Sequence, residues 1–362
     1  MFVSVNTNRK GFSLLELLVA VAVTAILAGM LFNITSQVMK TQTESSADLE
    51  TNQVAQFILD RIQEDLQCAV FKSDGNVWMA IDVVNLIPDF EELDDWKSSV
   101  SAKRESDLSL KLINRHWLPE LLTENDEANG QKTLDLSRFG VSGAWLRFFT
   151  EAPEVDSKSQ NTGGARAVSY RMLRHGITTP TSTPRYQLFR SDVSVANTFK
   201  AGYNLSDSIY EAISRVGARE AGNIFNPLFD KEGEQSTDFS IAANVVDFGI
   251  RAYVLEKKAK GAGYLKQIFP DINNTTDDFL YRATSRPGIT GDSTNKTLNQ
   301  FPDVVDVMIR VLTAEGASAL NAFENGLIPL QGGLDSDEAW WDLVEKNSQV
   351  FVRRIKILSK GL

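Results

Sequence analysis

Glu16 is the residue whose type and position most need a chemical explanation. It lies in residues 12–32, an apolar stretch that contains only two other polar side chains. An ionised carboxylate inside a membrane helix costs about 2.5–3.5 kcal/mol on insertion scales, so a charged partner is expected. A cut between Gly11 and Phe12 would create an α-ammonium about one helical turn before Glu16, on the same chain or on a neighbouring one. The alternative is a carboxylate tolerated near the membrane interface by protonation or snorkelling.

The residues around this acid also form a recognisable motif. Residues 10–17, KGFSLLEL, resemble the class III signal of type IV pilins and type II secretion pseudopilins. The resemblance implies that prepilin peptidase cuts after Gly11 and methylates Phe12, and that Glu16 supports docking between subunits. An ordinary secretory signal peptide and an unprocessed signal anchor remain as alternatives, although an acid inside the apolar core of a signal peptide is unfavourable.

The remaining candidates for chemistry are few. The chain contains two histidines, His116 and His175, and a single cysteine, Cys68. The histidines lie too far apart for a two-His zinc motif on one helix, and one cysteine excludes an intramolecular disulfide and a cysteine-based zinc site. No phosphate-binding loop is present, and we expect both histidines to be structural or exposed. The sequence therefore predicts no enzyme and no cofactor.

One acid-rich loop raises the question of calcium. Oxygen-bearing side chains alternate in residues 271–278, with Asp271, Asn273, Asp277 and Asp278 as the candidate ligands. The loop lacks the glycine and the closing glutamate of an EF-hand, so solvated turns are the alternative. Resemblance adds that some pseudopilin relatives bind calcium in such loops.

Composition and charge exclude other classes of protein. The chain has 362 residues, of which 43% are hydrophobic and 23% charged, and these are the proportions of a globular protein. Its formal net charge is −10. Nucleic-acid binding needs clustered Lys and Arg to neutralise phosphates, so we expect no nucleic-acid partner.

One long helix must position Glu16. Residues 12–32 have about the length needed to cross a bilayer, and the preceding Arg9 and Lys10 predict a cytoplasmic N-terminus. Helical periodicity continues to about residue 69. The predicted apolar stripe of this second half consists of Val54, Phe57, Ile58, Ile62, Leu66 and Ala69. Its predicted polar face consists of Asp60, Glu64, Asp65 and Gln67. Cys68 is expected to be buried at its end.

The rest of the chain predicts strands with a few helices. Alternation with a period of two indicates strands over residues 108–112, 144–150, 168–172, 185–190, 245–254, 304–312 and 349–358. Helices are predicted over residues 209–219, with Ser208 as the cap, and over residues 337–345. Residues 245–251 and 304–310 match at five of seven positions. We interpret this echo as two similar amphipathic strands, although two related strands that present Asp and Arg on one face are the alternative.

These elements predict the α+β class, in which a long N-terminal helix packs on a β-rich head with an antiparallel sheet. The expected divisions are a leader (1–11), a membrane or filament-core half of the helix (12–34), an amphipathic half (35–72) and a head (73–362). The order of elements is similar to that of J-type (PulJ- or PilW-like) minor pseudopilins. The chain also resembles the Verru_Chthon cassette group of pilin-like proteins, whose C member is similar in length and plan. Relative to the J type, residues 86–135, 192–238 and 256–300 look like insertions.

The sequence thus predicts a minor structural subunit of a type II secretion or type IV pilus-like periplasmic filament. The resemblance implies methylation, a single pass through the bacterial inner membrane, a periplasmic head, and prepilin peptidase and other pilin-like subunits as partners. A surface adhesin or uptake subunit with a ligand-binding head is the alternative, and a secreted hydrolase is a third interpretation.

Overall fold

The computed structural model describes residues 14–72, 74–83, 144–151, 164–176, 184–211, 224, 227, 239–257, 263–269, 280–284, 298–328 and 336–358. The chain divides into two compact units, Met1–Glu50 and Thr51–Leu362. A long helix, α1 (Leu14–Gln67), begins in the first unit and ends in the second. The finer predicted divisions at residues 11, 34 and 72 stay predictions.

The two parts of α1 differ in burial because they differ in apolar pattern. In the first unit residues 14–32 of the helix are apolar on all sides, residues 33–50 are mostly polar, and the large hydrophobic side chains are exposed from Leu14 to Leu49. In the second unit one stripe is buried and the other residues are polar or partly exposed. The buried apolar residues of this part are Ala55, Ile58, Leu59, Ile62 and Leu66. This spacing is that of an amphipathic helix that packs one face into a core.

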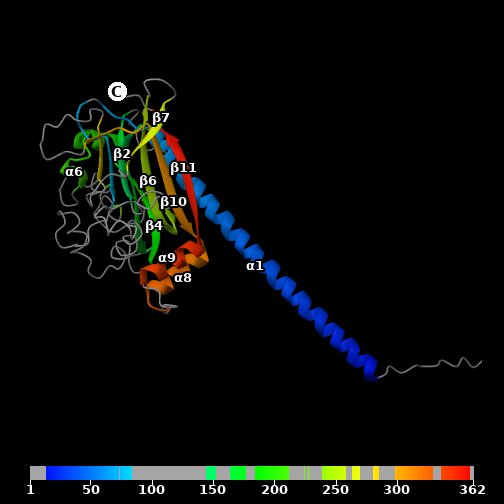
Figure 1. The fold of residues 1–362 in the computed structure, drawn as a ribbon. Helices are drawn as coiled ribbons and strands as arrows, with labels where there is room; N and C mark the ends of the chain where they lie inside the picture. Colours follow the sequence, from blue (N-terminus) through cyan, green and yellow to red (C-terminus); the bar gives the residue numbers. More distant parts are fainter. Residues whose placement is uncertain are drawn as a thin grey trace, which may run out of the picture. The chain divides into compact units, whose positions relative to one another are not determined.

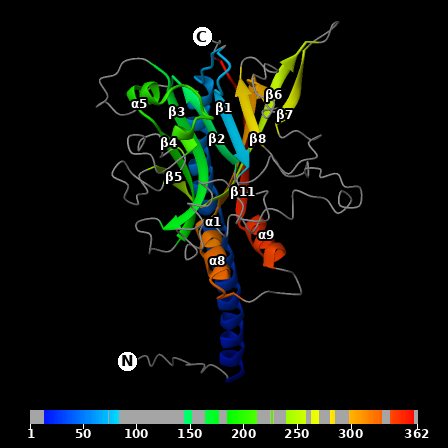
Figure 2. The same cartoon turned by 90° about the vertical axis from the view of Figure 1, so that its left-hand side faces the viewer.

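A seven-stranded sheet forms one layer of the head. Its order is β5 (Ser240–Ala243), β4 (Pro184–Asp192), β3 (Arg166–Gly176), β2 (Ala144–Thr150), β1 (Met79–Val83), β8 (Leu280–Thr284) and β9 (Leu298–Gln300). All neighbours are antiparallel except β8 and β9. Figure 2 shows the strands from β5 to β8 side by side, with the short helix α5 (Val195–Ala201) against β3.

A second sheet has four antiparallel strands in the order β11 (Ser348–Lys356), β10 (Val304–Leu312), β6 (Val245–Glu256) and β7 (Tyr264–Phe269) (Figure 1). Strand β6 contacts β2, β3 and β4, so the two sheets pack on each other there. Side chains from both sheets and from α1 join one hydrophobic core. The predicted α+β class, with a long N-terminal helix and antiparallel sheets, is confirmed.

Two helices close one end of the head. Helices α8 (Ala314–Glu324) and α9 (Ser336–Lys346) contact each other, β10 and β11 (Figure 1). Thr313 caps α8, because its hydroxyl accepts the Gly316 N–H at 3.0 Å. Glycine is required at that position, since a Cβ there would lie 2.4 Å from the Cβ of Asn347.

Several local predictions can be compared with these elements. The strands predicted over residues 144–150 and 304–312 have the observed bounds, and four others fall on β3, β4, β6 and β11. Residues 108–112 lie outside the described residues. Helix α6 (Ser208–Glu211) contains the start of the predicted helix. The capping residue was wrong by one position, because the Asp207 carboxylate accepts the Ile209 N–H at 3.0 Å.

The two similar segments, residues 245–251 and 304–310, lie in neighbouring strands of one sheet. Strands β6 and β10 pair antiparallel, so that Arg251 lies opposite Asp306 and Asp247 lies opposite Arg310. Each copy of the repeated pattern therefore places its acid against the base of the other copy. Of the two interpretations, the structure supports strands that present Asp and Arg on one face.

Candidate functional site

The apolar part of α1, residues 14–32, is the first candidate, and the described part of the chain provides no packing partner for its side chains. Its most apolar window has a mean hydropathy of 2.5 and is 0% buried. Among the described residues, α1 is the one helix whose length and composition allow it to cross a membrane. So much exposed apolar surface requires lipid or another protein around it.

Polar side chains in this part of α1 are arranged to suit an apolar environment. The Thr24 hydroxyl donates to the carbonyl of Ala20 at 2.7 Å, and the Thr35 hydroxyl donates to that of Leu31 at 2.8 Å. Each hydroxyl thus finds its acceptor on the preceding turn of the same helix. These threonines therefore add little to the cost of placing the helix in lipid.

Glu16 lies in the first described turn of α1, and its side chain is exposed. An acid is favoured at this end, because the helix macrodipole carries partial positive charge at its N-terminus. Gly11 and Phe12, the predicted cleavage and methylation positions, lie outside the described residues. The predicted pairing of Glu16 with the Phe12 ammonium stays a prediction.

The other end of α1 carries a buried polar cluster that joins the helix to the seven-stranded sheet. Asp65 is fully buried, and Arg190 of β4 binds its carboxylate through two guanidinium nitrogens, Nε and Nη2. The Nε–Oδ2 distance is 2.7 Å and the Nη2–Oδ1 distance is 3.1 Å. The Tyr170 hydroxyl of β3 donates to Oδ2 at 2.5 Å. The Asp65 backbone carbonyl also accepts the Thr150 hydroxyl at 2.8 Å.

The electrostatics of this cluster keep Tyr170 protonated and Arg190 charged. Burial and the nearby Asp65 charge raise the pKa of Tyr170 well above its ordinary value, so its hydroxyl remains a donor. Burial is the largest single influence on the pKa of Arg190 and lowers it, but the hydrogen bond to Asp65 and the neighbouring Tyr170, Asp65 and Asp192 together leave that pKa raised. A charged, bidentate pair with an additional donor is the arrangement in which a buried carboxylate is tolerated.

Asp65 is the residue that the sequence placed wrongly. The polar pattern predicts Asp65 on the polar face of α1, yet it lies three residues after Ile62 and four before Ala69, both of which are fully buried. Its helical position therefore already indicated the core face. Phe57 is the opposite error, because the sequence predicts it in the apolar stripe and the structure leaves it 58% exposed. The buried stripe includes Ala55 and Leu59, which lie on the side of the helix away from Phe57.

A second contact ties α1 to the four-stranded sheet. Arg353 of β11 forms an ion pair with Asp60, and its Nη2 donates to Gln56 Oε1 at 2.6 Å. The Asp60 side chain is 73% exposed, so this pair is a surface interaction. Cys68, predicted to be buried, is only half-buried, and burial followed by nearby acids raises the pKa of its thiol.

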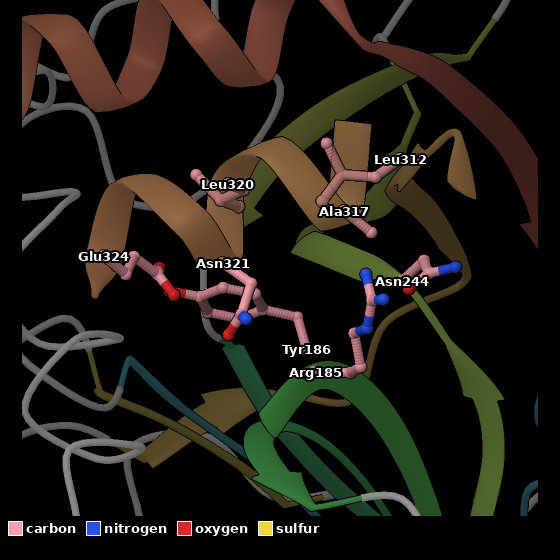
Figure 3. A pocket seen from close by; sticks show the side chains of 8 residues that line it. All are labelled: Arg185, Tyr186, Asn244, Leu312, Ala317, Leu320, Asn321 and Glu324. Atoms are coloured by element: carbon pink, nitrogen blue, oxygen red, sulfur yellow. The ribbon is translucent and has the colours of Figure 1, made fainter. Parts of the chain in front are cut away.

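A small pocket lies between β4, β10 and α8 (Figure 3). Its cavity volume is about 10 Å³, which is about the room that one water molecule needs, and none of the described residues that line it is a His, Cys or Ser. Glu324 accepts the Tyr186 hydroxyl at 2.5 Å and the Trp340 indole N–H at 3.0 Å. Arg185 points into the opposite side beside Asn244. The described lining residues thus place hydrogen-bonding groups around a small space.

Most of the other predicted candidates lie outside the described residues. His116 and the calcium candidates Asp271, Asn273, Asp277 and Asp278 lie outside the described residues. His175 stands opposite Arg185 in the register of β3 and β4. Within the described residues, no group of three or more His, Cys, Asp or Glu side chains is placed to hold a metal ion.

Comparison with known proteins gives one match. The family described as the prokaryotic N-terminal methylation motif matches residues 6–32, the segment that contains Gly11, Phe12 and Glu16. The match is consistent with a type IV pilin-like protein, and it implies processing by prepilin peptidase and assembly into filaments. The apolar helix fits a membrane-anchored protein of that kind. Neither a curated protein nor a solved structure matches the chain.

Proposed function

We propose that this chain is a minor pilin-like structural subunit, a pseudopilin, of a type II secretion or type IV pilus-like periplasmic filament. The observation that carries the proposal is the methylation motif at residues 6–32, whose apolar helix is left unburied by the residues that the structure describes. Prepilin peptidase cuts after Gly11, and the freed Phe12 is methylated. The role is structural, without an enzymatic activity or a cofactor.

Assembly in this proposal is driven by the apolar half of α1. Before assembly this half lies in the inner membrane, with the N-terminus in the cytoplasm and the head in the periplasm. In the filament the same side chains pack on the helices of other pilin-like subunits, so that lipid is exchanged for protein. Glu16 neutralises the α-ammonium of Phe12, on its own chain or on a neighbour, which offsets the cost of an acid in this environment.

The finer assignment follows from the plan of the chain. A long helix followed by a β-rich head is the order that resembles J-type pseudopilins and the C member of the Verru_Chthon cassette group. The many residues inserted between the strands of the head make it bulky. A bulky head suits a minor subunit better than a repeating shaft subunit, so we assign it a minor role.

The direct test is the N-terminal residue and mass of the protein extracted from membranes of its host. The expected result is a chain that begins at N-methylated Phe12. An intact Met1, or a start near residue 29 after cleavage by an ordinary signal peptidase, would refute the proposal. Replacing Gly11 with a bulkier residue should leave the full leader in place, whereas the same change at Gly29 should leave processing intact.

A further inference from the structure

We draw no further inference here: the strongest candidate, the exposed apolar patch that Leu255 and Leu265 form as cross-strand partners on the hairpin of β6 and β7, carries no proposal, because nothing in the described part of the structure shows what covers it.

Discussion

The two parts of helix α1 each contain an acid among apolar residues, but the acids have different surroundings. Asp65 is fully buried in the head, where Arg190 and Tyr170 bind its carboxylate. Glu16 is exposed on an apolar stretch that no other described segment covers. The head therefore compensates its acid when it folds. In the proposed function, the apolar part is completed only after proteolysis and contact with other molecules.

This difference shows where stability and assembly are controlled. Removing a partner of a buried pair leaves an uncompensated charge in the protein interior, which destabilises the fold. Removing an exposed acid from a membrane helix leaves the fold unchanged and affects only what the helix binds. Changes at Asp65 should therefore act on unfolding, and changes at Glu16 should act on incorporation into a filament.

Asp65→Ala should have the largest effect on stability. It leaves the Arg190 guanidinium buried without its carboxylate, which costs about 3–5 kcal/mol of unfolding free energy. Urea unfolding of the full chain in detergent, followed by tryptophan fluorescence, to which the buried Trp145 contributes, measures this loss. Asp60→Ala is the matched control, because Asp60 is an exposed acid on the same helix and should cost at most about 1 kcal/mol. Equal losses in the two variants would show that the buried pair has no special role.

Glu16→Val tests the other side of the comparison. We expect cleavage after Gly11 to continue and the unfolding of the head to be unchanged. Incorporation into filaments should fall by roughly tenfold, as expected for the loss of one charge-assisted interaction. Quantitative mass spectrometry of sheared or purified filaments measures the incorporated fraction. Normal incorporation of this variant would show that pairing between Glu16 and the Phe12 ammonium is wrong.

Tyr170→Phe should have a smaller effect on the head. The ring still packs beside Phe148, whose centroid lies 6.4 Å away, but one of the donors to Asp65 is lost. A hydrogen bond to a charged group contributes about 1.5–3 kcal/mol, and the same urea experiment should report a loss of this size. Tyr264→Phe removes a similar bond to the exposed Glu256 and should leave stability almost unchanged. Similar losses in both variants would contradict the importance of burial.

How much of this could be predicted depended on whether the deciding contacts were local. The apolar run of α1 and the alternation of β2 and β10 are properties of short segments, and these elements were predicted well. Helix α8 was missed because it directly follows β10 and contains Gly316, which normally disfavours a helix. Its glycine is explained only by the close approach of Asn347.

The candidate sites divide in the same way. The motif with Gly11, Phe12 and Glu16 is local, so the sequence alone indicated it. The pair of Asp65 and Arg190 joins residues 125 positions apart, and helical periodicity cannot name that partner. The sequence showed only that residues 245–251 and 304–310 are similar. The register of β6 and β10 decides which residues face each other, and it places Arg251 opposite Asp306.

The smallest effect near neutral pH, and the last test of the buried cluster, is the dependence of stability on alkaline pH. Burial first, then the Asp65 charge, raises the pKa of Tyr170 well above its ordinary value of 10.0. The unfolded chain therefore loses this proton near pH 10 while the folded chain keeps it. The resulting stability is complete below pH 10 and is lost as the pH rises toward the folded pKa, by about 1.4 kcal/mol per pH unit.

Burial also raises the pKa values of Tyr281 and Tyr210, so at least three buried tyrosines should contribute to the alkaline loss. Urea unfolding at several values between pH 9 and about 11.5 should give a steeper decline for the natural chain than for Tyr170→Phe. The difference in slope should correspond to one proton, and it should vanish below pH 9, where neither state titrates. Parallel curves over the whole range would mean that Tyr170 ionises equally in both states. In that case Asp65 would not have the dry, charged surroundings that distinguish it from Glu16.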